Sequence, residues 1–191
     1  MSRTDTPGDP QFDARRLAAR ARLDAMDDAG ASDPYRRAWF AAVYDTAGDD
    51  PAQIPWADLS PHPLLAAWLG AMPAPAAGAR ALDVGCGLGD NAAGIAARGF
   101  RVTAFDLSPR AIAWARPRFP QVEFMAADLF APPPQWNGAF DLVHECYTLQ
   151  ALPDASRRRA VRRAGPAACS TRAPGRTRPS TPAAGRTGPP P

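Results

Sequence analysis

The sequence of 191 residues predicts an α/β fold, in which a doubly wound parallel sheet follows a group of helices. Three observations lead to this prediction. Short apolar runs alternate with helical segments from residue 80 onward, the first run ends at closely spaced glycines, and amphipathic helical segments occupy residues 11–79. Such an alternation is typical of a parallel sheet that is covered by helices on both faces, with right-handed crossovers. Ligands of these sheets bind beyond the carboxyl ends of the strands.

The part of the chain before residue 80 is expected to be helical. Residues 1–10 are polar and are expected to be disordered, whereas residues 11–79 are expected to form a helical lid or cap. Asp33-Pro34 has the form of an N-cap followed by a first-turn proline, and Pro63 begins a further helix. The apolar faces of these two helices consist of Trp39, Phe40, Val43 and Tyr44, and of Leu64, Leu65, Trp68, Leu69 and Met72. We expect both faces to pack over the carboxyl ends of the strands.

Four strands are recognised in the core segment, residues 80–163. They are expected over residues 80–84, 100–105, 122–125 and 140–145. Helices are expected over residues 91–98, 108–118 and 153–163, and the second of them begins with the N-cap and proline pair Ser108-Pro109. Four strands make an incomplete version of the doubly wound sheet.

The first strand ends in the loop Gly85-Cys86-Gly87-Leu88-Gly89. Glycine allows a positive φ and a close approach of the backbone to a ligand. The spacing G-x-G-x-G differs from the G-x-G-x-x-G of dinucleotide folds. Asp83 precedes the loop, and its carboxylate would repel a pyrophosphate but attract an ammonium or a sulfonium group. The loop therefore favours S-adenosylmethionine over NAD.

Two further acids follow the next strands. Asp106 ends the second strand, where a carboxylate can accept hydrogen bonds from both ribose hydroxyls. Asp128 follows the third strand, where it can accept from an adenine amino group. A helix-capping role for Asp106 and a surface-turn role for Asp128 are the alternatives, although Ser108 is the better cap.

Together these segments resemble motifs I to IV of class I S-adenosylmethionine-dependent methyltransferases, whose fold is Rossmann-like. The resemblance covers residues 80–163 and includes Asp83 to Gly89, Asp106-Leu107, Asp128-Leu129 and Phe140-Asp141-Leu142-Val143. A looser likeness, to the branch related to thiopurine S-methyltransferases, rests on Trp39-Phe40, Ile54-Pro55-Trp56, Pro63-Leu64-Leu65 and the segment from Tyr147 to Leu152.

The resemblance implies a role for each matching residue. The glycines would line the methionine and ribose, Cys86 would fill space among them, and Asp83 would face the methionine end. Asp106 would hold the ribose, and Asp128 the adenine amino group. The implied cofactor-binding set is Asp83, Gly85, Cys86, Gly87, Gly89, Asp106, Leu107, Asp128, Leu129 and Glu145.

The catalytic residue stays open, and Glu145 and Tyr147 are the candidates beside the transferring methyl group. Glu145 can equally be a strand-end acid, and Tyr147 a packing residue. Trp39 and Trp56 are core residues or belong to a lid over the cofactor. For His144, a satisfied or exposed histidine is favoured over a general base.

Composition narrows the function classes. The three cysteines form no CxxC pair, which argues against a disulfide framework and against a metal site. No apolar stretch is long enough for a membrane helix and the N-terminus is no secretory signal, so a cytoplasmic enzyme is expected. The partner would be a small-molecule methyl acceptor, and the oligomeric state stays open.

The last part of the chain differs sharply from the rest. Residues 157–191 hold 9 Arg and no acid, while residues 1–156 hold 13 Arg and all 19 Asp and Glu. Nucleic acid is an improbable partner, because the basic segment has no aromatic residue for base stacking. Residues 164–191 contain 7 Pro, 4 Gly and no Leu, Ile, Val, Met or aromatic residue, a composition that predicts a disordered tail.

That tail suggests a shifted reading frame or a truncation in a GC-rich gene, with a genuine basic tail as the rival explanation. The fourth strand would then be an exposed edge, and the protein would be marginally stable. The alternative function is accordingly an inactive partial methyltransferase fold with weak or no cofactor binding.

Overall fold

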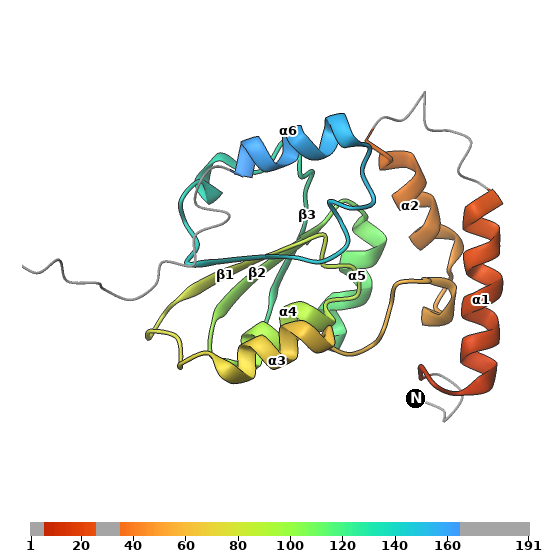
Figure 1. The fold of residues 1–191 in the computed structure, drawn as a ribbon, viewed down its shortest axis with the longest axis horizontal. Coiled ribbons are helices and arrows are strands. Elements are labelled where there is room, and N and C mark those ends of the chain that lie inside the picture. The colour runs from red at the N-terminus through yellow and green to blue at the C-terminus, as the bar shows by residue number, and fades with distance from the viewer. Residues whose placement is uncertain (1–5, 26–34, 165–191) are drawn as a thin grey trace, which may run out of the picture.

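A parallel sheet of four strands forms the centre of the computed structural model, which describes residues 6–25 and 35–164 (Figure 1). The strand order is β3-β2-β1-β4, and all three pairings are parallel. The strands are β1 (Arg80–Val84), β2 (Arg101–Asp106), β3 (Glu123–Ala126) and β4 (Leu142–Glu145). The α/β class and the doubly wound parallel sheet that the sequence predicts are confirmed.

Helices cover both faces of this sheet. They are α1 (Pro10–Ala25), α2 (Arg37–Thr46), α3 (Pro63–Ala71), α4 (Asp90–Ala97), α5 (Pro109–Arg118) and α6 (Asp154–Ala164), with the short 3₁₀ helices η2 (Pro51–Gln53) and η3 (Pro134–Trp136). Figure 1 shows α6 on one side of the sheet and α3 and α4 on the other. The main core lies on the second side, where apolar residues of α3, α4 and α5 pack on β1, β2 and β3.

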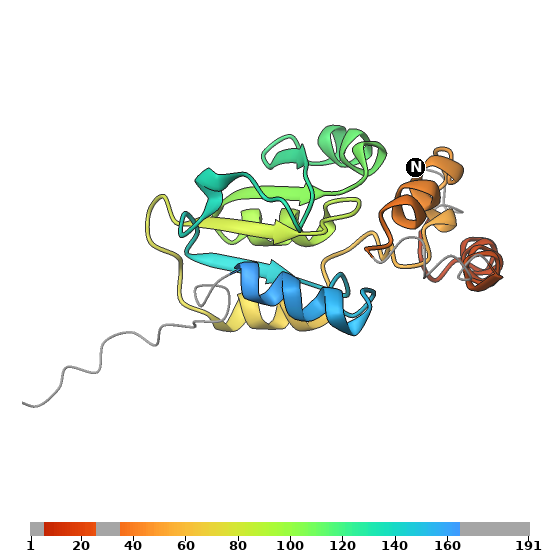
Figure 2. The same ribbon diagram turned by 90° about the horizontal axis from the view of Figure 1, so that it is seen from above.

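The N-terminal helices α1 and α2 lie beyond the carboxyl ends of the strands (Figures 1 and 2). In α2, Val43 and Tyr44 are buried, and α2 packs against α5. The expected helix start at Asp33-Pro34 lies outside the described residues. Within the described residues α2 begins at Arg37, after Arg36 in the left-handed conformation with φ 53°.

Helix α3 differs from the sequence expectation of a lid. Its N-cap is His62, whose side chain accepts a hydrogen bond from the backbone N–H of Leu64, and Pro63 is at the first turn. Leu65 and Leu69 are buried in the core, but Leu64 and Trp68 are 76% and 41% exposed. The expected single apolar face is therefore split, and α3 packs beside α4 on the sheet layer instead of over the strand ends.

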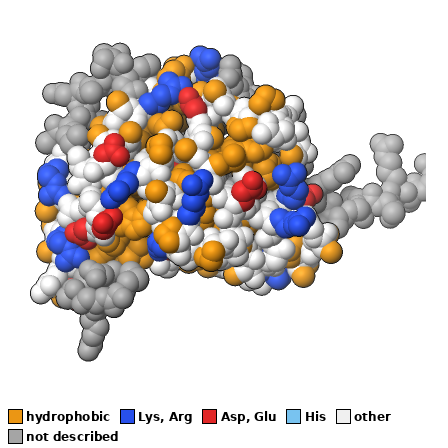
Figure 3. Space-filling view, turned by 180° about the vertical axis from the view of Figure 1, so that it is seen from behind, with side chains coloured by type: hydrophobic (Ala, Val, Ile, Leu, Met, Phe, Trp, Pro, Cys, Tyr) orange, Lys and Arg blue, Asp and Glu red, His pale blue; other side chains and the backbone are white. Residues whose placement is uncertain are grey.

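At the edge of the sheet, β4 pairs only with β1 among the described strands. The Pro/Arg-rich residues 165–191, on which the expectations of a disordered tail and a shifted frame depend, lie outside the described residues. Figure 3 shows arginines and acidic residues, some of them next to one another, among apolar side chains on the rear face of the molecule. No helix among the described residues combines the length and the apolar character that crossing a membrane requires.

Candidate functional site

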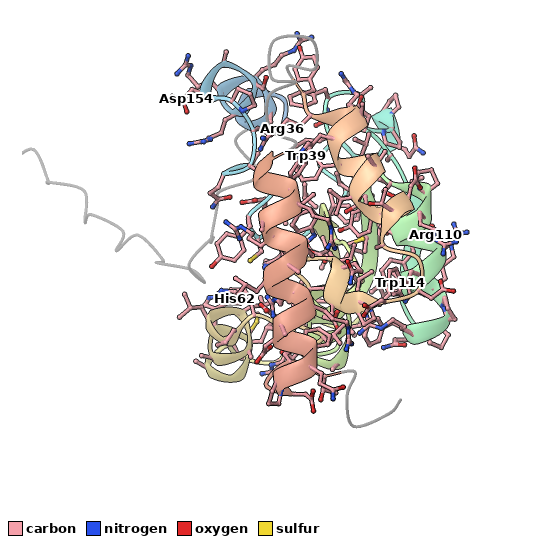
Figure 4. The ribbon with its side chains drawn as sticks, turned by 90° about the vertical axis from the view of Figure 1, so that its right-hand side faces the viewer. Arg36, Trp39, His62, Arg110, Trp114 and Asp154 are labelled. Atoms are coloured by element: carbon pink, nitrogen blue, oxygen red, sulfur yellow. The ribbon has the colours of Figure 1, made fainter. Side chains whose placement is uncertain are left out.

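A cavity of about 700 Å³ lies at the carboxyl ends of β1, β2 and β4. Its floor consists of residues that follow these strands, and its outer wall comes from α1, α2 and the segment before α3. Figure 4 looks toward the strand ends: α1 crosses in front, Arg36 and Trp39 lie on the α2 side, and His62 lies on the opposite side. The cavity occupies the place where doubly wound sheets bind their ligands.

The glycine loop after β1 forms part of the floor, with Gly85, Cys86 and Gly87 on the lining. Gly85 has φ 65°, and a Cβ there would collide with the side chain of Thr148. Thr148 Oγ1 in turn donates to the carbonyl oxygen of Val84 at 3.3 Å. Gly87 has φ 53°, and a Cβ there would lie 3.0 Å from the hydroxyl of Tyr44. Glycine at position 85 therefore leaves room for the side chain of Thr148, and glycine at position 87 lets the loop lie close to Tyr44 in the cavity wall.

The third glycine of the loop serves a different purpose. Gly89 is the N-cap of α4 with φ 88°, and it does not lie on the cavity lining. A Cβ at this position would approach Phe124 Cζ to 2.7 Å and Phe119 to 3.1 Å. The absence of a side chain at Gly89 lets α4 pack against β3 and the end of α5, and the expected contact of Gly89 with the cofactor stays a prediction.

Asp106 lies on the cavity lining at the end of β2, and only 7% of its surface is exposed. Its Oδ2 accepts from the backbone N–H of Gly87 at 3.0 Å, and its Oδ1 accepts from that of Ser108 at 2.9 Å. Burial raises the pKa of this carboxyl, and the hydrogen bonds from Ser108 and Gly87 oppose that effect. One carboxylate thus joins the glycine loop to the end of β2, and each oxygen retains a lone pair.

Asp83 does not face the cavity. It is 1% exposed, and its Oδ1 lies 2.6 Å from Nδ1 of His144 on the neighbouring strand β4. Its Oδ2 is buried without a hydrogen-bond partner among the described residues. Burial raises the pKa of the Asp83 carboxyl, and His144 lowers it. The side chain of Asp83 is thus buried against His144, which is a satisfied histidine, and the expected contact of Asp83 with a methionine moiety stays a prediction.

Asp128 is also off the lining, and it is bound to α2. Its Oδ2 accepts from Nη2 and Nε of Arg37 at 2.6 and 2.9 Å, and its Oδ1 accepts from the backbone N–H of Phe130 at 2.8 Å. The expected hydrogen bond to an adenine amino group would have to compete with this bidentate ion pair. The neighbouring Leu129 does lie on the lining, and so does Leu107 after β2.

The two catalytic candidates, at the end of β4 and just after it, differ in their position relative to the cavity. Glu145 is off the lining, and its Oε1 accepts from the backbone N–H of Leu149 at 2.7 Å. Tyr147 is on the lining, is 60% exposed and has φ 64°, a conformation that non-glycine residues rarely adopt. Its hydroxyl lies 3.3 Å from Nε2 of His62. Glu145 therefore shapes its own turn, while Tyr147 is left facing the cavity.

The aromatic part of the cavity wall includes Tyr44 and the two lid candidates Trp39 and Trp56. Trp56 Nε1 donates to the hydroxyl of Tyr44 at 3.0 Å, and the rings of Trp39 and Trp56 stack with centroids 5.9 Å apart. Burial raises the pKa of Tyr44 well above its ordinary value, and Asp106 adds to the effect. The aromatic stripe on α2 signals this wall, because Trp39 and Trp56 are at once packing residues and cavity residues. The lining residues that sequence reasoning missed are Arg16, Arg20, Arg36, His62, Asn91, Cys146 and Thr148.

The strand order and the cavity at the carboxyl edge define a Rossmann-like α/β domain. Residues 81–167, from β1 to just beyond α6, match the family model described as Methyltransferase domain. This part of the chain is accordingly similar to methyltransferase domains.

Individual proteins are also similar to this chain. The chain is 40% identical over 76 residues to trans-aconitate 2-methyltransferase of Paracidovorax citrulli, which is 39% of this chain and 29% of that enzyme. A solved protein from work on the conversion of a disulfide bond into a thioacetal group during echinomycin biosynthesis shares 30% identity, with a TM-score of 0.55, over 65% of this chain and 54% of that one. An S-adenosylmethionine-bound amino pentose methyltransferase from Micromonospora echinaspora shares 32% identity, with a TM-score of 0.44, over 52% of this chain and 42% of that one.

The match spans less than a third of the curated relative and about half of the echinomycin protein. None of these three is a thiopurine S-methyltransferase, so the likeness to that branch stays a prediction.

Proposed function

We propose that the chain binds S-adenosylmethionine in the cavity and transfers its methyl group to a small-molecule acceptor. The observation that carries the proposal is Asp106, a nearly buried carboxylate at the end of β2 that faces the cavity while it holds the glycine loop. Such an acid at the second strand end suits two ribose hydroxyls.

The residues present fit this cofactor. Gly87 brings the backbone to the floor without a side chain in the way, and Leu107 and Leu129 offer apolar surface for an adenine ring. A cavity of about 700 Å³ is within the range of small-molecule sites. When bound, the cofactor supplies a methyl group on a sulfonium, ready for in-line displacement.

The chain contributes alignment and exclusion of water. Asp106 would fix the ribose, and the stacked rings of Trp39 and Trp56 would form a dry wall. Alignment of two reactants can contribute about 7–11 kcal/mol to the barrier reduction. The ion pair between Arg37 and Asp128 joins the start of α2 to the end of β3, so it would hold this wall in place without touching the adenine.

An inactive partial fold is the second candidate. The observation in its favour is β4, which has a strand partner on one side only among the described residues. Such a product would bind the cofactor weakly or not at all.

Isothermal titration separates the two candidates. We expect the wild-type chain to bind S-adenosylmethionine and S-adenosylhomocysteine and to ignore NAD, because Gly85, Gly87 and Asp106 form a floor without the dinucleotide glycine spacing. NAD serves as the matched control, since it carries the same adenosine. Heat from NAD with none from S-adenosylmethionine would show that the assignment is wrong, and heat from neither would favour the inactive fold.

Helices α1 and α2, which cap the cavity, are expected to respond to a bound ligand. Helices α1 and α2 supply Arg20, Trp39 and Tyr44 to the outer wall, so a bound ligand should slow backbone hydrogen exchange in both helices. Helix α3 serves as the internal control, because Leu65 and Leu69 bury it in the sheet layer. Hydrogen exchange followed by mass spectrometry, with and without S-adenosylmethionine, measures the effect. Equal protection of α3 and α2 would contradict a local cap.

A further inference from the structure

The mouth of the cavity has a polar pair that no part of the cofactor assignment uses. His62, just before α3, and Tyr147, just after β4, both lie on the lining. Their rings meet edge to face with centroids 5.6 Å apart, and His62 Nε2 lies 3.3 Å from the Tyr147 hydroxyl. The pair thus joins the segment before α3 to the segment after β4 across the opening.

The hydrogen bonds of His62 fix its tautomer. Its Nδ1 accepts from the backbone N–H of Leu64 at 3.2 Å, while the backbone N–H of His62 donates to Oδ1 of Asn91 at 2.8 Å. A neutral imidazole that accepts at Nδ1 carries its proton on Nε2. His62 Nε2–H therefore donates to the hydroxyl oxygen of Tyr147, and the Tyr147 proton is directed to another partner.

The backbone of Tyr147 strengthens this interpretation. A φ of 64° costs a tyrosine free energy that an ordinary packing position does not need. The side chain is nonetheless 60% exposed, so its burial does not explain the strain. The strained turn holds the Tyr147 hydroxyl on the cavity lining, 3.3 Å from Nε2 of His62.

The lining carries arginines as well as carboxylates. The three carboxylates there already accept hydrogen bonds from this chain: Asp58 from Arg16, Asp90 from Arg118, and Asp106 from Gly87 and Ser108. Arg20 and Arg36 add positive charge to the same wall. A hydrogen bond to an ionised oxygen is about twice as strong as one between neutral groups.

We propose that His62 and Tyr147 form the acceptor subsite, in which the Tyr147 hydroxyl donates to a carboxylate of the methyl acceptor. This inference rests on the proposed function. In the reaction, a carboxylate oxygen forms a bond to the methyl carbon while the carbon–sulfur bond breaks and its electron pair stays on sulfur. The products are a methyl ester and S-adenosylhomocysteine. No proton is released, so the site needs no general base. It needs only a hydrogen-bond donor that positions the methyl acceptor.

The test uses the full chain with S-adenosylmethionine and four probe acceptors: trans-aconitate and benzoate as carboxylates, benzylamine as an amine, and thiophenol as a thiol. Mass spectrometry identifies the methylated product, and titration gives the cofactor affinity of each variant. We expect methyl esters, and we expect Tyr147→Phe to raise KM for the carboxylate about tenfold or more with unchanged cofactor affinity.

His62→Asn is the matched variant, because asparagine is a good N-cap but is too short to reach Tyr147. We expect it to keep the stability of the wild type and to raise KM roughly threefold, and we expect Tyr147→Phe to have a smaller effect in its background. Methylation of the amine or the thiol alone, methylation of no carboxylate, or an unchanged KM in Tyr147→Phe would each overturn the subsite while cofactor binding stands. If the wild-type chain did not bind the cofactor, the proposed function itself would be wrong.

Discussion

Replacing Asp106 with Ala is expected to weaken binding of S-adenosylmethionine by about 1–3 kcal/mol, which is roughly 5- to 150-fold. The carboxylate faces the cavity, so its loss removes acceptors for the ribose hydroxyls. It also leaves the backbone N–H groups of Gly87 and Ser108 without their acceptor, which loosens the glycine loop. Isothermal titration of the variant measures the combined effect.

Asp128→Ala is the matched control for Asp106→Ala. Both aspartates follow a strand, and the family resemblance gives both a role in binding the adenosine part of the cofactor. The structure places only Asp106 on the lining, while Asp128 binds Arg37. We therefore expect the smaller loss of affinity for Asp128→Ala. An Asp106→Ala variant that binds the cofactor as tightly as the wild type would contradict the proposed site. A larger loss of affinity for Asp128→Ala than for Asp106→Ala would indicate that Asp128 does bind the adenine amino group.

Gly89→Ala is expected to destabilise the fold by about 2–5 kcal/mol. A φ of 88° is left-handed and costs an alanine about 1–2 kcal/mol. The added Cβ would also lie 2.7 Å from Phe124 Cζ in a packed core, and such overpacking costs about 1–3 kcal/mol. Urea denaturation gives the free energy of unfolding.

Gly78→Ala separates the two causes. Gly78 has φ 80°, nearly that of Gly89, but a Cβ there would meet nothing within 4 Å. We expect this variant to lose only the backbone contribution, about 1–2 kcal/mol. Equal losses for the two variants would mean that contact with Phe124 adds nothing at Gly89, and that the third glycine is required by its backbone conformation alone.

Much of the fold could be predicted from local signals in the sequence. Apolar runs bounded by glycines mark the strands, and the pair Ser108-Pro109 marks the start of α5, where Ser108 accepts from the backbone N–H of Ala111. The position of Asp106 at the carboxyl end of β2 could also be predicted, because parallel strands bring their carboxyl ends to one edge. These features depend on residues close together in the chain.

The contacts of Asp83 and Asp128 could not be predicted in the same way. Asp83 meets His144 on another strand, and Asp128 meets Arg37 on a helix that comes before the sheet. Each partner lies far away in the sequence, and the family motif gives no sign of it. The split face of α3 has a similar cause, since its apolar periodicity does not say which part of the stripe meets the sheet.

The edge position of β4 has a consequence for how the molecule folds and opens. Along the chain, only one helix separates β1 from its partner β2. By contrast, β2, β3 and the helices that follow β1 and β2 lie between β1 and its other partner, β4. The contact order of the β1–β4 pairing is therefore higher, and its loop-closure entropy favours late formation. With one neighbour among the described strands, β4 also has fewer hydrogen bonds to break on opening. The part of the cavity around Tyr147, which would select the acceptor, thus depends on the β1–β4 pairing, which is expected to form late and to open early. Asp106 and the glycine loop depend on the β1–β2 pairing, which is expected to form earlier.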